Sequence, residues 1–310
     1  MSSKFKYVIV LSGNHEYYYG EYHAVNDQIR SITQSIGNNV YFLQRDCLEL
    51  DDVLPNIRIL GTTLWCDYEK KAHQNFKQIV NDFQRVYWNK NYSKEQKHSS
   101  KEDEKEAEYP LIEPSQINKI HKEDVAWIKR ELQRAQSDGK RVVVLSHHAP
   151  TDFGCVGYDK SKHPVAYSTQ YSNLEYLFNK PLVAWFFGHT HYNADIVVRT
   201  EDDWFIRYAT NQSGYQYTKI AQYYVSSKAV ALHENDYWIE YLKGNPKETH
   251  EVVIKFSDCK QSRNVAKVDE HKKEKKLHVT MIEYTQLMQQ VNVKKDYLPK
   301  DAKNGDCTLM

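Results

Sequence analysis

The sequence predicts an α/β fold, chiefly because three short apolar segments each end abruptly in polar residues. These segments are residues 6–12, 141–146 and 182–187, and all three are rich in residues that favour β-strands. Longer stretches with apolar residues at three-and-four spacing occur between them and indicate helices. Strands that alternate with such helices are typical of α/β proteins. With 310 residues, 40% of them hydrophobic, the chain is long enough to bury the core of one large domain.

Apolar periodicity and turn signals predict the other elements in order along the chain. The expected helices are residues 22–36, a helix around 76–87, residues 117–137, one opened by a capping box at 172–175, and a short one after a second capping box at 280–283. The expected further strands are residues 40–43 and 57–60 with a turn at Pro55 and Asn56 between them, a hairpin of 196–199 and 204–208, and a closing strand at 252–256. The first amides of the helix at 22–36 would favour an anionic group near the preceding strand.

Side chains that can bind a metal ion follow each of the three apolar segments. They are Asn14, His15 and Glu16 after the first segment, His147 and His148 after the second, and His189 and His191 after the third. Because parallel strands bring their carboxyl ends to one edge of a sheet, we expect these side chains to meet. Neutral imidazole is a ligand for zinc, iron, manganese and nickel, so the pattern predicts a metal site. Three unrelated exposed turns would be the alternative.

These motifs resemble those of the calcineurin-like metallophosphoesterases. The family signature is Asp-x-His, Gly-Asp, Gly-Asn-His-Asp/Glu, a His after a strand, and Gly-His-x-His, and this chain has the last three blocks in order. Weaker similarities at residues 61–68, 81–83 and 211–215 point to a small-molecule-type branch. The resemblance spans about residues 5–256. It implies a β-sandwich flanked by helices in α-β-β-α layers, here incomplete at its N-terminus.

The resemblance also implies a ligand set. Asn14, His147 and His189 resemble ligands of the second metal site, and His191 resembles a ligand of the first. The family uses two divalent ions, and manganese, iron, zinc and magnesium are the candidates. The implied activity is that of a phosphoric ester hydrolase, either a phosphatase or a phosphodiesterase, which attacks a phosphate ester with water activated by two metals.

Further roles follow from the same resemblance. His15 would stabilise charge on the phosphate or protonate the leaving oxygen, and Glu16 would hold its ring. His148 could be a second ligand, a substrate contact or neither. Asp67 and Asp82 resemble substrate-pocket residues, although ordinary surface carboxylates on a loop and a helix are an equally good interpretation.

The family's Asp-x-His and Gly-Asp blocks do not precede Gly13. Without their carboxylates the first metal site is incomplete, and a dication is expected to bind weakly. Three explanations are open: a missing start, a natural pseudoenzyme, or blocks placed elsewhere, such as 269–271 and 305–306. A pseudoenzyme would be a non-catalytic binding or scaffold protein tethered to a membrane.

Composition and the chain ends suggest where the protein acts. A net charge of +1 gives no support for nucleic-acid binding, and five cysteines without a C-x-x-C pair favour a reducing, cytoplasmic setting. The last four residues, starting at Cys307, fit a prenylation box of the farnesyl type, which would add peripheral membrane contact. We expect a phosphoesterase domain at 1–256 with a mobile polar insertion at about 89–108. A charged tail with a short helix should follow at 257–310.

Overall fold

The computed structural model describes a subset of the chain. The described residues are 6–51, 54–69, 73–91, 109–157, 159–200, 202, 204–212, 249–254 and 277–282. The expected insertion lies outside them from residue 92 onward, and so does most of the expected tail, including Cys307. Of the helices that the structure describes, none combines the length and the apolar character needed to cross a membrane.

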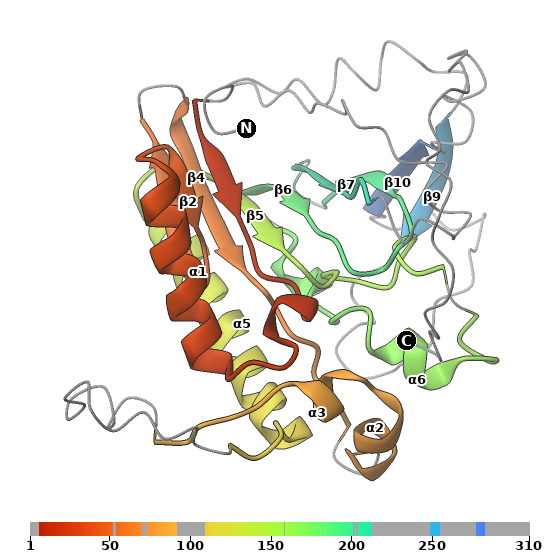
Figure 1. The fold of residues 1–310 in the computed structure, drawn as a ribbon. Coiled ribbons are helices and arrows are strands. Elements are labelled where there is room, and N and C mark those ends of the chain that lie inside the picture. Colours follow the sequence, from red (N-terminus) through yellow and green to blue (C-terminus); the bar gives the residue numbers. More distant parts are fainter. Residues whose placement is uncertain are drawn as a thin grey trace, which may run out of the picture.

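Two sheets form the centre of the fold (Figure 1). In the smaller sheet, β1 (Val8–Val10) pairs in parallel with β2 (Val40–Phe42). The larger sheet has the order β3-β4-β5-β6-β8-β7-β10-β9, in which β4, β5, β6 and β8 run parallel. Its strands are β3 (Asp46–Leu50), β4 (Leu54–Thr62), β5 (Arg141–Ser146), β6 (Leu182–Phe186), β7 (Asp195–Arg199), β8 (Phe205–Ala209), β9 (Thr249–Ile254) and β10 (Leu277–Ile282).

The described helices are α1 (Tyr22–Ile36), α2 (His73–Ile79), α3 (Asp82–Arg85), α5 (Pro114–Ser137) and α6 (Pro164–Ser168), together with the 3₁₀ turns η2 (His15–Tyr17) and η4 (Glu175–Leu177). Helix α1 packs on β2, on the outer side of the smaller sheet (Figure 1). Helix α5 packs against β4 and β5 of the larger sheet.

Alternation along β5 shows how the layers are joined. Val142 and Val144 are buried in the cluster that contains Ile128 and Leu132 of α5. Val143, which points to the opposite face, is buried in a cluster with Ile59 of β4, and side chains of β1 and β2 pack against that cluster. The fold is therefore layered α-β-β-α, which confirms the predicted fold class.

Helix α1 differs from its sequence-based description in two respects. Its apolar stripe is only partly covered, because Ile32 and Ile36 are 50% and 55% exposed. Two strands of three residues each offer too little surface to cover a 15-residue helix. The amides that were expected to favour an anion at the site are capped by Glu21, whose carboxylate accepts from the backbone N–H groups of His23 and Ala24.

Several predicted boundaries were wrong because strand pairing overrides local signals. Pro55 and Asn56 lie inside β4, at a shift in its pairing register with β3, and β5 pairs only with the later residues 57–62. Thr280 lies within β10, which pairs with β7 and β9, so the second capping box does not open a helix there; residues from 283 onward are outside the described part. Strand β3 was not among the strands expected from the sequence.

The expected helix at 76–87 is divided into α2 and α3, with Val80 and Asn81 between them. The capping box at Ser172 is followed by a single 3₁₀ turn, η4, without a side-chain cap. The hairpin was predicted correctly, since β7 and β8 pair antiparallel, and the closing strand corresponds to β9.

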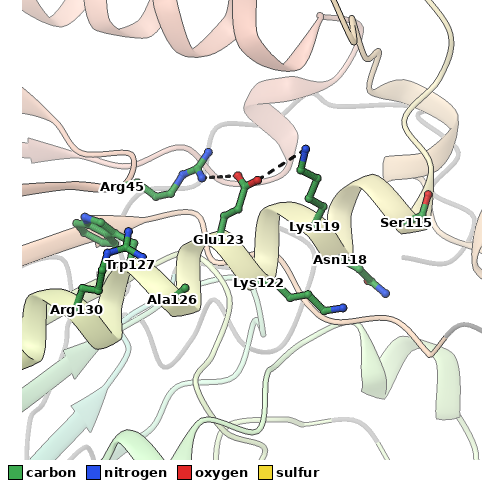
Figure 2. A pocket seen from close by; sticks show the side chains of 9 residues that line it. All are labelled: Arg45, Ser115, Asn118, Lys119, Lys122, Glu123, Ala126, Trp127 and Arg130. Atoms are coloured by element: carbon green, nitrogen blue, oxygen red, sulfur yellow. Dashed lines mark hydrogen bonds and ion pairs between the residues drawn. The ribbon is translucent and has the colours of Figure 1, made fainter.

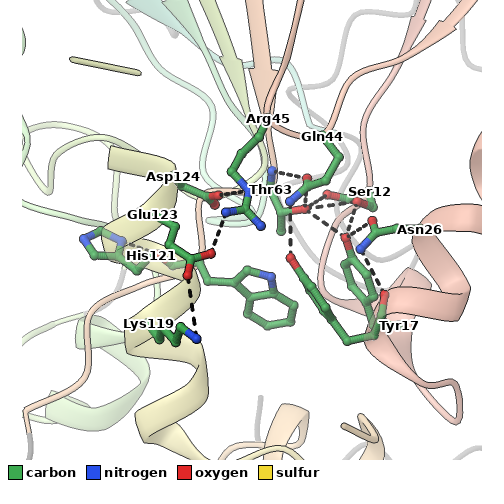
Figure 3. Close-up of polar contacts among 12 residues, drawn as sticks. Ser12, Tyr17, Asn26, Gln44, Arg45, Thr63, Lys119, His121, Glu123 and Asp124 are labelled. Carbon is green, nitrogen blue, oxygen red and sulfur yellow. Dashed lines mark hydrogen bonds and ion pairs between the residues drawn. The ribbon is translucent and has the colours of Figure 1, made fainter. Parts of the chain in front are cut away.

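A polar network joins the end of β1 to the end of β4 and to α5 (Figure 3). The Ser12 hydroxyl lies 3.0 Å from the Thr63 hydroxyl, and the Thr63 backbone N–H donates to the side-chain oxygen of Gln44 at 2.9 Å. The next residue, Arg45, places its Nε 3.3 Å from Oδ1 of Asp124, a fully buried residue of α5. Burial raises the pKa of Asp124 to about 7, and the charge of Arg45 opposes that rise.

A close approach of Gly13 to His147 sets the distance between the two sheets at their carboxyl ends. A Cβ atom on Gly13 would lie 2.5 Å from Cε1 of His147. The ring of His147 cannot move aside freely, because the rings of His148 and His189 lie 5.1 Å and 5.0 Å from it, measured between centroids. Only glycine allows this approach.

Replacing Gly13 should therefore destabilise the fold where the same change at Gly188 does not. Gly13→Ala should lower the free energy of unfolding by about 1–3 kcal/mol through overpacking. Gly188→Ala is the matched control, because its Cβ would lie 3.6 Å from the same ring. Urea denaturation of both variants measures the difference. Equal stability of the two alanine variants would contradict the close approach.

The buried Asp124 should make stability depend on pH. Its folded-state pKa of about 7 exceeds the ordinary value of 3.8, so the folded protein loses stability as pH rises through that window. Asp124→Asn has no proton to lose there. Relative to wild type, this variant should gain up to about 4 kcal/mol of unfolding free energy between pH 4 and pH 8. Denaturation at several pH values tests this, and a difference that does not change with pH would refute it.

Candidate functional site

Three predicted ligand side chains meet at the carboxyl ends of the strands. The Asn14 side-chain oxygen lies 3.0 Å from Nε2 of His147, and the same nitrogen lies 3.1 Å from Nδ1 of His189. Asn14 is 5% exposed, and both histidines are half-buried. Three donor atoms from segments far apart in the sequence therefore converge on one point. We call Asn14, His147 and His189 the donor trio.

The strands that carry the trio belong to two sheets. Strands β5 and β6 are parallel neighbours in the larger sheet, whereas β1 lies in the smaller one, so the three strands do not share one sheet edge as expected. The packed sheets bring their ends together instead. The Gly188 N–H donates to the carbonyl of His147 at 2.9 Å, and the His148 N–H donates to that of Thr63 at 3.2 Å. These bonds join the loops after β4, β5 and β6.

Other histidines surround the trio. His15 is exposed and His191 is half-buried, and the positive charge of either one would act on both His147 and His189. Burial, followed by repulsion from neighbouring histidines, holds the pKa values of His147 and His189 well below the ordinary range. Burial likewise lowers the pKa of His191. These imidazoles are neutral at pH 7, which is the form that binds metals.

The loop after β6 is held in a strained conformation. His189 and His191 have φ values of 66° and 50°, in the left-handed region that residues with a Cβ seldom adopt. Gln212 stabilises the loop, since its side-chain oxygen accepts from the His191 N–H at 2.8 Å and its amide donates to Thr190 at 2.8 Å. In the sequence, Gln212 is noticeable only as part of the weak family similarity at residues 211–215. Its role depends on a contact across 21 residues.

The turn after β1 is closed by its own residues. The carboxylate of Glu16 accepts from the Gly13 N–H at 2.7 Å, which fixes the 3₁₀ turn η2. The His15 ring stacks on Tyr18, with centroids 4.6 Å apart and an interplanar angle of 30°. In the structure, Glu16 therefore stabilises the turn, and the Tyr18 ring holds the ring of His15 by stacking.

The candidate substrate residues have different surroundings. His148 is fully buried, and its ring centroid lies 4.1 Å from that of His189. Of the three roles left open for it, a substrate contact fits this burial least. Asp67 is exposed, and its charge acts on buried His121, which agrees with the surface interpretation. Asp82 is 3% exposed and accepts from Asn14 Nδ2 at 2.8 Å, so it too lies behind the trio, where a substrate would not reach it.

The donor trio fits one divalent cation. An ion with bonds of about 2.1 Å at right angles separates neighbouring ligand atoms by about 3.0 Å, which matches both spacings in the trio. All three donors are neutral. Within the described residues, no group of three or more His, Cys, Asp or Glu side chains is arranged to hold a metal ion. The fit rests on two imidazoles and one amide, without a carboxylate.

A cavity of about 810 Å³ runs along the outer face of α5 (Figure 2). Its described lining includes the cationic side chains of Arg45, Lys119, Lys122 and Arg130, together with Trp127. Arg45 is paired there with Glu123 at 2.6 Å. The described lining contains no member of the donor trio, so this cavity is distinct from the histidine cluster.

Comparisons with known proteins agree with this geometry. A family model described as calcineurin-like phosphoesterase matches residues 1–193. The chain is 24% identical over 222 residues to "Uncharacterized protein L509" of Acanthamoeba polyphaga mimivirus, an alignment that covers 68% of this chain and 69% of the viral protein. No solved structure matches the chain. Members of the matched family are metal-dependent phosphoester hydrolases that typically bind two divalent ions. Because the family model matches more than half of its residues, this chain belongs to the calcineurin-like phosphoesterase family.

Proposed function

We propose that this protein hydrolyses phosphoric esters at the donor trio with the help of a divalent cation. The observation that carries the proposal is the convergence of Asn14 Oδ1, His147 Nε2 and His189 Nδ1 at spacings of 3.0 and 3.1 Å. Asn14 is buried and the two histidines are half-buried, and a single cation between the three neutral donor atoms would be bound by all of them. Manganese, iron, zinc and magnesium are the candidate ions.

The residues around the trio suit this chemistry. A divalent cation bound there would neutralise charge on the phosphate and make water more acidic. Water then attacks phosphorus while the ester P–O bond breaks, and the leaving oxygen takes a proton. His15 is exposed beside the cluster and can donate that proton or a hydrogen bond to the phosphate. Its stacking on Tyr18 holds the ring in place. Glu16 supports His15 indirectly, through the turn.

Among the described residues, the family resemblance assigns only His191 to the first metal site. A second cation would therefore have that one ligand from the described set. His191 is half-buried and held by Gln212 through its backbone N–H. We therefore propose that the donor trio is the stronger of the two sites.

A non-catalytic binding or scaffold role is the alternative function. The neutral donor trio favours it, because none of its three side chains is a carboxylate that would bind a dication directly. A farnesyl group on Cys307 would tether such a protein to a membrane. We propose a cytoplasmic setting for both functions, with a phosphate ester as the ligand or substrate.

Hydrolysis of p-nitrophenyl phosphate and bis(p-nitrophenyl) phosphate with added Mn²⁺ tests the proposal. Turnover should disappear with a chelator. His189→Ala should lower kcat/KM at least about 100-fold, because losing a metal ligand costs more than losing a residue that only hydrogen-bonds to a ligand. His163→Ala, an exposed histidine next to α6, is the control and should keep its activity.

Two outcomes would reject the hydrolase and favour the scaffold. One is that wild type neither binds Mn²⁺ nor turns over either ester. The other is that His163→Ala and His189→Ala retain equal, metal-independent activity.

A further inference from the structure

We infer that Asp82 is a positioning residue that fixes the side-chain amide of Asn14 with its oxygen toward His147 and His189. Asp82 Oδ1 accepts a hydrogen bond from Asn14 Nδ2 at 2.8 Å on the side opposite the trio. The inference rests on the proposed function in one respect, namely that Asn14 Oδ1 serves as a ligand.

An asparagine ligand needs such a partner. The oxygen and nitrogen of a primary amide have nearly the same shape, so a half-turn exchanges them without a change in packing. Only the oxygen has a lone pair to offer a cation. The neighbours of the amide therefore decide whether Asn14 is a ligand or presents N–H groups to the ion. His147 Nε2 at 3.0 Å does not decide this, because neutral imidazole nitrogen is a donor or an acceptor depending on its tautomer.

Asp82 removes this ambiguity. Oδ1 of Asp82 accepts from both Asn14 Nδ2 and the Tyr18 hydroxyl, so in this geometry it is an acceptor and not a donor. Burial raises the pKa of Asp82, and these two hydrogen bonds lower it. A flipped Asn14 amide would bring two acceptor oxygens together in a place where Asp82 is only 3% exposed, so water could not relieve the contact. The observed orientation is the one in which every polar atom between the two side chains has a partner.

Tyr18 holds Asp82 in its position. The Tyr18 hydroxyl donates to Asp82 Oδ1 at 2.7 Å and accepts from Asn14 Nδ2 at 3.3 Å, which closes a three-residue cycle. The ring of Tyr18 stacks on His15, and the guanidinium of Arg85 lies 5.4 Å from the centre of the same ring. Asp82 and Tyr18 thus connect the proposed ligand Asn14 to the proposed proton donor His15.

Asp82 itself touches no substrate in this arrangement. Its burial and its place behind Asn14 exclude the pocket role that the family resemblance suggested. It nevertheless places a buried carboxylate one hydrogen bond away from the neutral trio, which partly offsets the charge of a bound cation.

The Asn14 side-chain amide can be observed directly by ¹⁵N–¹H NMR in the metal-free protein. Its two proton signals are assigned by their loss in Asn14→Ala. In wild type, one proton should be shifted downfield and should exchange slowly with water, since it is bonded to a buried carboxylate. Signals at the positions of a free amide would overturn the inference without any variant of Asp82.

Two substitutions then separate position from charge. Asp82→Leu keeps the branched shape in a somewhat larger side chain but removes the acceptor, so the amide signals should move to free values and Mn²⁺ affinity should fall about 10–100-fold. Asp82→Asn keeps a carbonyl acceptor, so both the shifted amide signals and the Mn²⁺ affinity should be preserved better than in Asp82→Leu. Asp27→Leu, an exposed aspartate on α1, is the control and should change neither. Unaltered amide signals and affinity in a folded Asp82→Leu variant would contradict the inference.

Failure of the proposed function gives a different result. Wild type that binds no Mn²⁺ but shows the shifted, slowly exchanging amide would reject the cation site and retain the Asp82–Asn14 pair. Wild type that binds Mn²⁺ with a free amide would reject the positioning role alone.

Discussion

The contact of Gly13 with the ring of His147 is the constraint on which the site depends. Each sheet has its own hydrogen-bond register, and nothing within either register aligns β1 with β5. Alignment comes from side chains buried between the sheets and from the absence of a Cβ at residue 13. Because interiors are packed as closely as crystals, a shift at this contact would be transmitted to Asn14, the next residue. The packing of the two sheets therefore determines the geometry of the donor trio.

Polar residues reinforce this junction from behind. Ser12, Thr63 and Gln44 bond the two strand ends to each other, and the Arg45–Asp124 pair ties the same region to α5. Asp124 is a buried carboxylate with a raised pKa, so this anchorage lowers stability at neutral pH compared with acidic pH. The loop after β6, which carries His189, has strained φ values at His189 and His191. Backbone strain of this kind tends to collect at functional sites.

Much of the fold could be predicted from local sequence signals. The strands before Gly13, His147 and Gly188 are continuous apolar runs, and the helix at 117–137 has a clear stripe and ends near Gly139, so local pattern and tertiary structure agree there. The pattern failed where pairing partners are distant. Thr280 carries a helix-start signal but pairs with Val197 of β7, and Ile32 and Ile36 look like core residues but are half-exposed on α1.

The donor atoms could be predicted, but their supports could not. Asn14, His147 and His189 follow strands, and strand ends are a general location for sites. Asp82 and Gln212 act through contacts 68 and 21 residues away in sequence, which no spacing rule reveals. His148 was ambiguous because adjacent residues in a loop can point toward the site or into the core, and only packing decides between them. Its ring fills the space between Trp65 and His189.

Anomalous diffraction from crystals soaked in Mn²⁺ would show whether a cation binds at the donor trio. We predict a manganese peak about 2.1–2.2 Å from Asn14 Oδ1, His147 Nε2 and His189 Nδ1, with those three atoms close to their present spacing. A map without a peak between these atoms at saturating Mn²⁺, or with manganese bound only elsewhere, would contradict it.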